Sequence, residues 1–212
     1  MQHFSLLGLF GLAAVLGTRG AQAAPGGPAR RIVVVGDSLS AEYGLARGQG
    51  WVALLGARLQ SDKRGWEVLN ASISGDTTAG GRARLPALLA SQHPAIVIVE
   101  LGGNDMLRGL PLEASRANLL AMIEAAQRAG AKVVLVGMQV PPNFGARYVD
   151  GFTAMYAELA RTQHCALVPF LLKGVADKPD VDAWFQADRI HPVARAHPII
   201  LENVWAVLKP LL

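Results

Sequence analysis

Strand-like and helix-like segments alternate along the chain from residue 30 onward, and this alternation is what most constrains the fold. Short apolar runs rich in Val and Ile occur at residues 32–35, 66–70, 95–101, 132–138 and 166–170. Apolar residues at helical spacing follow at residues 51–59, 81–90, 112–129, 152–161 and 198–208. The strand-like runs lack a polar alternation, which is typical of strands buried on both faces.

A β–α alternation of this length predicts the α/β class, with a parallel sheet covered by helices on both faces. The chain has 212 residues, of which 51% are hydrophobic and 17% charged. This is ample for one hydrophobic core and marginal for two, so we expect a single domain over residues 31–212.

The N-terminal segment has the pattern of an export signal. Residues 4–16 form an apolar block too short to span a bilayer, and "AQA" at 21–23 fits a small-residue cleavage site. We expect a cleaved signal peptide over 1–23, a short tether over 24–30, and a periplasmic or secreted protein without a stable membrane anchor. No Lys or Arg precedes the apolar block and Arg19 follows it, so a retained anchor is the alternative. Cys165 is the only cysteine, which excludes an intramolecular disulfide.

Several functional classes are disfavoured by composition and by missing motifs. The formal net charge of +4 is small and scattered, which argues against nucleic-acid binding. The chain has no G-x-S-x-G, no G-x-G-x-x-G, no P-loop, no H-E-x-x-H and no paired cysteines. His164 and Cys165 are adjacent, but Cys165 begins a predicted strand and is better explained as a core residue.

Polar segments follow the predicted strands. "GDSLS" follows the first, "NASISGDT" the second, "LGGND" the third, and "DRIHP" comes after the fifth, before the last helix. In parallel α/β sheets ligands bind beyond the carboxyl ends of the strands. We therefore expect these four segments to meet at one edge of the sheet.

A serine in "GDSLS" needs a general base before it can act as a nucleophile. Of the histidines, His3 leaves with the signal, and His93 and His164 precede strands, at the amino edge. His197 fits a surface residue in the first turn of the last helix. His191 remains, with Asp188 three residues before it, a spacing that lets the carboxylate reach the imidazole. Taken alone, however, "DxxHP" is more often a capped helix start with an exposed histidine.

An oxyanion needs hydrogen-bond donors as well. Gly75 exposes a backbone N–H without an intervening Cβ, and the Asn104 side chain offers a neutral NH2 group. Each could also belong to an ordinary turn, and Ser38 or Ser40 could simply cap a helix. Four such fragments at the same predicted edge of the sheet favour a catalytic site over separate turns and caps.

These four blocks, "GDSLS", "SGDT", "GGND" and "DRIHP", resemble those of the SGNH (GDSL) hydrolase superfamily. More narrowly, stretches such as "NASISGDTTAGGRARLPALL", "VIVELGGNDMLRGL" and "MQVPPNFGARYVDGF" resemble the periplasmic acyl-CoA thioesterase I / lysophospholipase / arylesterase group. The resemblance implies a three-layer α/β/α sandwich with a five-stranded sheet of flavodoxin-like order. It implies no metal or organic cofactor. We also expect a monomer.

The resemblance also implies roles for individual residues. Ser38 becomes the nucleophile, His191 the base and Asp188 its orienting partner, with oxyanion donors from Ser38 N–H, Gly75 N–H and the Asn104 side chain. The implied reaction is hydrolysis of a small acyl ester or thioester through an acyl-enzyme. The loops "MLRGL" and "QVPPNFG" offer apolar surface for the acyl group, at Met106, Leu107, Leu110, Val140 and Phe144.

Two other functions remain open. The same four blocks serve carbohydrate O-acetylesterases elsewhere in the superfamily. A flavodoxin-like binding module, with "GDSLS" holding a phosphate at a helix N-terminus, is a non-enzymatic alternative.

Two residues depart from the group's pattern. Arg189 stands where the group has Gly in "DGxHP", which predicts backbone strain or a redirected turn. Glu42 stands where the group has small residues, and we expect its carboxylate at the cleft mouth to disfavour anionic substrates. Asp37 we expect to brace its loop by accepting backbone N–H bonds.

Overall fold

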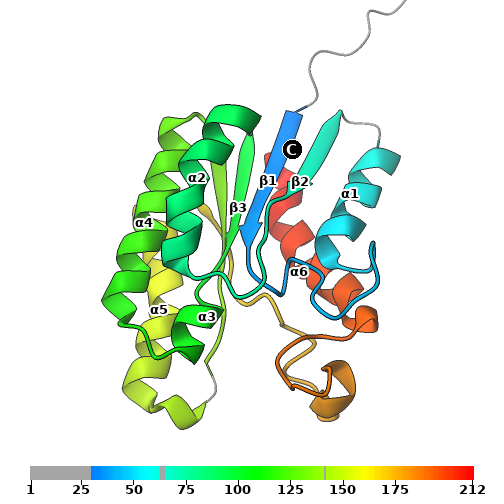
Figure 1. Cartoon of the computed structure of the whole chain (residues 1–212), viewed down its shortest axis with the longest axis vertical. Helices are drawn as coiled ribbons and strands as arrows, with labels where there is room; N and C mark the ends of the chain where they lie inside the picture. The colour runs from blue at the N-terminus through cyan, green and yellow to red at the C-terminus, as the bar shows by residue number, and fades with distance from the viewer. Residues whose placement is uncertain (1–29, 63–64, 141) are drawn as a thin grey trace, which may run out of the picture.

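A computed structural model describes residues 30–62, 65–140 and 142–212. The predicted signal peptide and residues 24–29 of the predicted tether lie outside this range. The described chain forms a five-stranded sheet in the order β2-β1-β3-β4-β5, with every pair of neighbours parallel (Figure 1). This confirms the α/β class and the flavodoxin-like strand order that the resemblance implied.

The strands are β1 (Arg30–Gly36), β2 (Trp66–Asn70), β3 (Ile96–Glu100), β4 (Lys132–Val136) and β5 (Ala166–Val168). β3 lies at the centre, and all five of its residues are buried. Val34 of β1 stands opposite both Asn70 of β2 and Ile98 of β3. The carboxyl ends of the strands therefore reach the same edge of the sheet.

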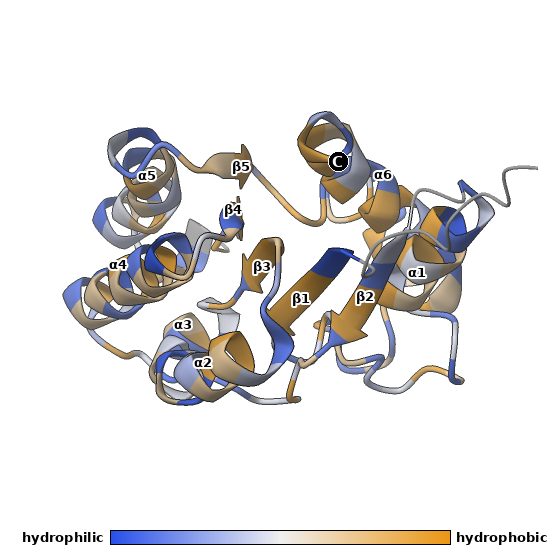
Figure 2. Ribbon diagram, turned by 90° about the horizontal axis from the view of Figure 1, so that it is seen from above, coloured by the Kyte–Doolittle hydropathy of each residue, from blue (hydrophilic) through white to orange (hydrophobic). Residues whose placement is uncertain are grey.

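The helices are α1 (Trp51–Ser61), α2 (Thr78–Gln92), α3 (Gly103–Leu107), α4 (Leu112–Arg128), α5 (Ala146–Thr162) and α6 (His197–Leu208). Short 3₁₀ turns lie at Pro142–Phe144, Val181–Trp184, Ala194–Ala196 and Lys209–Leu211. α1 and α6 cover one face of the sheet, and α2, α4 and α5 cover the other (Figure 2). The three-layer sandwich expected from the sequence is thus observed.

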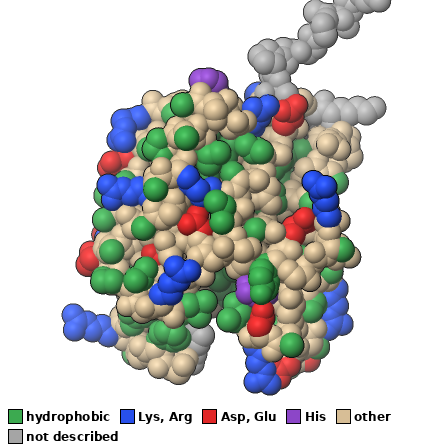
Figure 3. Space-filling view, viewed as in Figure 1, with side chains coloured by type: hydrophobic (Ala, Val, Ile, Leu, Met, Phe, Trp, Pro, Cys, Tyr) green, Lys and Arg blue, Asp and Glu red, His purple; other side chains and the backbone are tan. Residues whose placement is uncertain are grey.

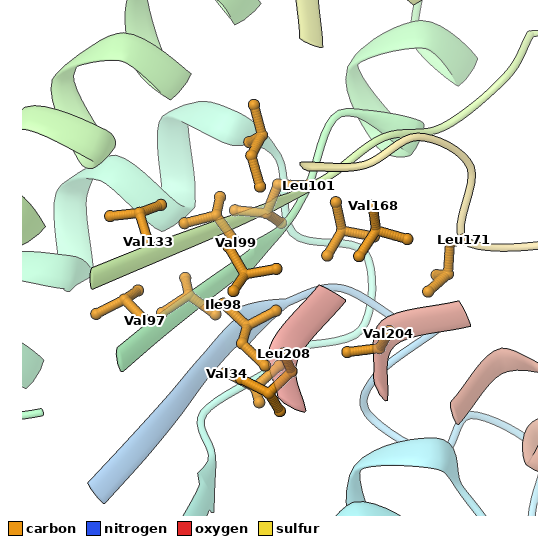
Figure 4. Close-up of a cluster of buried hydrophobic side chains, with 14 of the residues drawn as sticks. Val34, Val97, Ile98, Val99, Leu101, Val133, Val168, Leu171, Val204 and Leu208 are labelled. Atoms are coloured by element: carbon orange, nitrogen blue, oxygen red, sulfur yellow. The ribbon is translucent and has the colours of Figure 1, made fainter. Parts of the chain in front are cut away.

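The core lies on both faces of the central strands. Val34 and Ile98 lie with Val204 and Leu208 of α6 in one cluster, which Figure 4 shows in close-up. All four side chains have no exposed surface. Full burial of a side chain of this size stabilises the fold by about 1.5–3 kcal/mol.

Two helices begin earlier than their apolar patterns indicated. α2 begins at Thr78, not at residue 81, because the Thr77 side chain accepts a hydrogen bond from the Gly80 N–H and caps the helix. α5 begins at Ala146, not at residue 152. The first turn of α2, with Thr78 and two glycines, carries little hydrophobic periodicity, whereas the first turn of α5 contains Tyr148 and Val149 packed against the core, which the prediction missed.

His197 is a correction to the sequence prediction. It begins α6 but is only 2% exposed, so it is not a surface residue. Its Nδ1 accepts the backbone N–H of Trp51 at 3.0 Å.

In the described part of the chain, no helix has the length and apolar character needed to cross a membrane.

Candidate active site

The two serines of "GDSLS" lie in different surroundings. Ser38 is half-buried and lines a cavity at the carboxyl edge of the sheet. Ser40 is 1% exposed, and its Oγ donates to Glu100 Oε2 at 2.7 Å and accepts from Trp51 Nε1 at 3.2 Å. Only Ser38 can therefore meet a substrate.

His191 lies beside Ser38 and Asp188. The Nε2 of His191 is 2.8 Å from Ser38 Oγ, and its Nδ1 is 2.6 Å from Asp188 Oδ2. A carboxylate at Nδ1 holds the proton there, which leaves Nε2 free to accept the serine hydrogen. The structure thus brings together the three residues that the sequence singled out.

Asp188 is held by its own turn. Its Oδ1 accepts the backbone N–H groups of Ile190 at 2.9 Å and of His191 at 3.0 Å. These hydrogen bonds, above all the one from the His191 backbone N–H, lower the pKa of Asp188 to about 2. Arg189 has φ 58°, the left-handed conformation that favours Gly, yet the Asp188–His191 contact is intact. The departure from Gly costs strain but does not redirect the turn.

The other two candidate oxyanion donors, Gly75 and Asn104, also line this cavity. Gly75 has φ 79°, a conformation that a side chain would strain, and its carbonyl accepts from Arg108 Nη2 at 2.8 Å. Asn104 lies in α3, a short helix that the sequence did not predict, and its Nδ2 donates to Asp37 Oδ2 at 2.9 Å. One amide hydrogen of Asn104 is used by this bond and the second is free for a ligand.

Arg84 of α2 ties the loops after β1 and β2 together. Its Nε donates to Asp76 Oδ2 at 2.8 Å, and its guanidinium also donates to the carbonyls of Ala71 and Gly36. These bonds place the Gly75 turn against the end of β1. Arg84 was not predicted from the sequence, because it belongs to no motif. Its partners are the Asp76 carboxylate and two backbone carbonyls.

Two acidic side chains are buried beneath the serine turn. Asp37 Oδ1 accepts the Leu39 N–H at 3.0 Å, the bracing role expected from the sequence. Burial raises the pKa of Asp37 to about 6. Burial raises the pKa of Glu100 well above its usual range, and the charge on Asp37 raises it further. Since Asp37 accepts two N–H donors, we assign the charge to Asp37 and the neutral acid to Glu100.

The cavity has a volume of about 750 Å³. Its walls are mostly apolar, and besides Ser38, Gly75, Asn104 and His191 they include Leu39, Tyr43, Met106, Leu107, Met138, Phe170, Leu172, Ala176, Val181, Phe185 and Ile190. The space-filling view shows the hollow between two lobes, with hydrophobic side chains and a histidine at its wall (Figure 3). This shape suits an apolar chain that ends at Ser38.

Only two of the five predicted acyl-binding residues line the cavity. Met106 and Leu107 line the cavity, whereas Leu110, Val140 and Phe144 are not among its lining residues. Val140 is buried, and Phe144 stacks near Tyr148 at a second, separate hollow. The missed residues Met138 and Phe170 closely follow β4 and β5, so strand order was a signal that could have found them.

Glu42 does not lie where the sequence suggested. It is not among the cavity-lining residues, and its carboxylate accepts the backbone N–H groups of Gly48 at 3.0 Å and Gly50 at 2.7 Å. The residue itself has φ 61°. Its carboxylate therefore braces the loop before α1, which removes the basis for an effect on anionic substrates.

Within the described residues, no three His, Cys, Asp or Glu side chains are grouped so as to hold a metal ion. That the protein needs no metal or cofactor stays a prediction. Cys165 lies before β5, and burial raises the pKa of its thiol to about 11, which disfavours a reactive thiolate.

The α/β/α fold and a serine–histidine–aspartate contact at its carboxyl edge are the features of a serine hydrolase. The GDSL-like lipase/acylhydrolase family matches residues 34–199, more than half of the chain. The chain belongs to this family, and it is an ester-hydrolysing enzyme.

Named relatives agree with this. The chain is 53% identical over 184 residues to esterase TesA of Pseudomonas aeruginosa, covering 87% of this chain and 90% of that protein. It is 41% identical over 180 residues to thioesterase 1/protease 1/lysophospholipase L1 of Escherichia coli (strain K12), covering 85% and 84%. A crystal structure of TesA superposes with a TM-score of 0.82 at 52% identity, covering 86% of this chain and all of that one.

Proposed function

We propose that the enzyme hydrolyses carboxylic esters and thioesters through an acyl-enzyme on Ser38. One observation carries this proposal: Ser38 Oγ, His191 and Asp188 form a continuous hydrogen-bonded chain, with contacts of 2.8 and 2.6 Å, at the wall of an apolar cavity. A serine so placed has the base and the orienting carboxylate that nucleophilic catalysis needs.

In the first half-reaction, Ser38 Oγ attacks the acyl carbonyl carbon while His191 Nε2 takes the serine proton. The negative charge of Asp188 stabilises the imidazolium that forms. Ser38 N–H, Gly75 N–H and the free amide hydrogen of Asn104 donate to the oxyanion of the tetrahedral intermediate. The intermediate collapses to the acyl-enzyme as His191 gives the proton to the leaving alcohol or thiol.

In the second half-reaction, His191 takes a proton from water, and the resulting hydroxide attacks the acyl carbonyl. The second intermediate collapses with return of the proton to Ser38 Oγ and release of the carboxylic acid. No cofactor takes part in this scheme, because each proton moves between the substrate, water, Ser38 and His191.

The cavity favours an acyl chain over a sugar. Most of its lining side chains are apolar, among them Met138, Phe170 and Leu172, and these offer no hydrogen bonds to hydroxyl groups. The names of the relatives, an esterase and a thioesterase/lysophospholipase, support the same substrate class. A carbohydrate O-acetylesterase is therefore not favoured.

The nucleophile is tested with a p-nitrophenyl ester of a short acid. Ser38→Ala should abolish hydrolysis, whereas Ser40→Ala should retain most of it, because Ser40 faces Glu100 rather than the cavity. Loss of activity in Ser40→Ala with full activity in Ser38→Ala would overturn the assignment.

The substrate class is tested with a series of p-nitrophenyl esters and acyl-CoAs of increasing chain length. We expect kcat/KM to rise from acetyl to longer acyl groups, because each added methylene is buried in the apolar cavity. Activity confined to acetyl esters would favour the O-acetylesterase.

The proposed location is the periplasm or the cell exterior, after removal of residues 1–23. The support is the apolar block and the "AQA" sequence, followed by a described domain that begins with β1 at Arg30. N-terminal sequencing of the protein recovered from a periplasmic fraction should begin at residue 24. Recovery of the intact N-terminus from the membrane fraction would show a retained anchor.

A further inference from the structure

Ser38 and His191 are separated by 153 residues in the sequence, so their 2.8 Å contact depends on how two segments are held together. Ser38 belongs to the loop of residues 36–50, here called the serine loop. His191 belongs to residues 184–193, here called the histidine hairpin. In Figure 1 the histidine hairpin lies in the orange segment that leads into α6.

The histidine hairpin is closed by its own hydrogen bonds. The Gln186 N–H donates to the His191 carbonyl at 2.7 Å, and the Val193 N–H donates to the Trp184 carbonyl at 3.0 Å. Phe185 and Pro192 form an isolated antiparallel bridge. The hairpin thus fixes His191 relative to Gln186, but these bonds do not fix it relative to Ser38.

The Gln186 side chain makes the link to the serine loop. Its Nε2 donates to the Tyr43 carbonyl at 2.9 Å and to the Pro192 carbonyl at 3.2 Å. Both segments are fully described, and besides the Ser38–His191 contact this is the one hydrogen bond between them. The Tyr43 ring also lies over the His191 ring, with centroids 4.2 Å apart.

We propose that Gln186 is a positioning residue that sets the distance between His191 Nε2 and Ser38 Oγ. This role rests on the proposed function, since it acts through those two residues. A primary amide suits it, because its two hydrogens can serve the two carbonyls at once. Gly44 of the serine loop has φ 70°, and a Cβ at this residue would lie only 2.0 Å from Gln186 Oε1. Because Gly44 has no side chain, the Gln186 amide fits against the loop.

The test replaces the amide without removing its bulk. Gln186→Met keeps the length but has no donor, and Gln186→Glu keeps the shape but turns a carboxylate toward two carbonyls. We expect kcat for a short p-nitrophenyl ester to fall about tenfold to a hundredfold in Gln186→Met, as small misplacements of reacting groups do. KM should change little, because Gln186 is not among the cavity-lining residues. Gln186→Glu should lose at least as much.

Gln127→Met is the matched control. Gln127 Nε2 donates to the Gln163 carbonyl at 2.7 Å, at the opposite edge of the sheet. The Gln127→Met variant loses a comparable side-chain hydrogen bond and should keep the wild-type kcat. Thermal melting of both variants should show similar small shifts, so that the kcat loss in Gln186→Met cannot be ascribed to unfolding.

The rate of labelling by a fluorophosphonate probe separates the two levels of the proposal. Slower labelling of Gln186→Met than of Gln127→Met, with both folded, supports the positioning role. Equal labelling and equal kcat in the two variants would overturn it and leave the proposed function intact. Failure of the wild-type enzyme to be labelled at Ser38 would instead contradict the proposed function itself.

Discussion

Asp37 connects the serine turn with the oxyanion site. It is 2% exposed, and its carboxylate accepts from the Leu39 N–H and from Asn104 Nδ2. The second of these bonds restrains the rotation of the Asn104 amide, and Asn104 lines the cavity. In the proposed mechanism, Asp37 thereby positions an oxyanion donor and takes no proton itself.

Asp37→Asn should lower kcat about tenfold to a hundredfold with little change in KM, because an amide in place of the carboxylate supplies one acceptor oxygen instead of two and Asn104 is no longer held. Steady-state kinetics on a p-nitrophenyl ester measure both constants. Asp182→Asn is the control: Asp182 also lines the cavity, but it pairs with the exposed Arg189. Equal kcat in the two variants would contradict this role for Asp37.

At the residue scale, the sequence located the side chains that follow strands in short motifs. Ser38, Gly75, Asn104 and His191 line the cavity, and Asp188 contacts His191 from outside its lining. Arg84 and Gln186 escaped notice because their partners are mainly backbone carbonyls of distant loops. A carbonyl carries no residue identity, so such contacts leave no pattern in the sequence.

At the scale of elements, the N-terminus of α1 joins three parts of the chain. Gly50 offers no side chain for capping, and the Glu42 carboxylate accepts the Gly50 N–H at 2.7 Å. His197, at the start of α6, accepts the Trp51 N–H through Nδ1. The first donors of α1 are therefore satisfied by side chains from outside the helix.

Burial lowers the pKa of His197 below its ordinary value of 6.5, and the Pro192 carbonyl and the Glu42 charge oppose this in part. The folded state then binds a proton less readily than the unfolded state. The stabilisation from neutral His197 is present above pH 6.5 and is lost as the pH falls below it. Urea unfolding at a series of pH values should show this loss.

His197→Phe should lower the free energy of unfolding at pH 7.5 by about 1–3 kcal/mol, because the buried Trp51 N–H loses its acceptor. The substitution should also make the free energy of unfolding depend less on pH between neutral and mildly acidic solution. His93→Asn, at an exposed residue before β3, should keep the wild-type dependence. An undiminished pH dependence in His197→Phe would show that other groups cause it.

Glu42 offers a second test at this scale. Glu42→Gln should reduce the free energy of unfolding by about 1 kcal/mol, since a charged acceptor of two backbone N–H groups becomes a neutral one. The ratio of kcat/KM for an acyl-CoA to that for a neutral ester should not change, because Glu42 is not among the cavity-lining residues. A raised ratio at low salt would restore a role in substrate choice.

At the scale of the whole molecule, strand runs buried on both faces and their alternation with helices sufficed to predict the α/β/α layers. The strand order followed from the resemblance, because alternation alone does not order the strands. α3 was not predicted, since "GGND" resembles a turn and the helix has only five residues. Its place after β3 could be predicted, and that is what brings Asn104 to the cavity.

The cavity itself was the least predictable part. Its apolar wall combines residues after β1, β3, β4 and β5 with residues of the histidine hairpin. Apolar character identified Met106 and Leu107 but equally suggested Val140 and Phe144, which pack elsewhere. Which apolar loop residues face a cavity depends on the loop conformation, and the sequence pattern does not determine that.

The central claim is that Ser38 is a nucleophile activated by His191. Its most direct test is to treat the enzyme with a fluorophosphonate probe and to locate the adduct by peptide mass spectrometry. We predict one adduct per chain, on Ser38, and its loss in His191→Ala. An adduct on Ser40 or another serine, or undiminished labelling of His191→Ala, would contradict the claim.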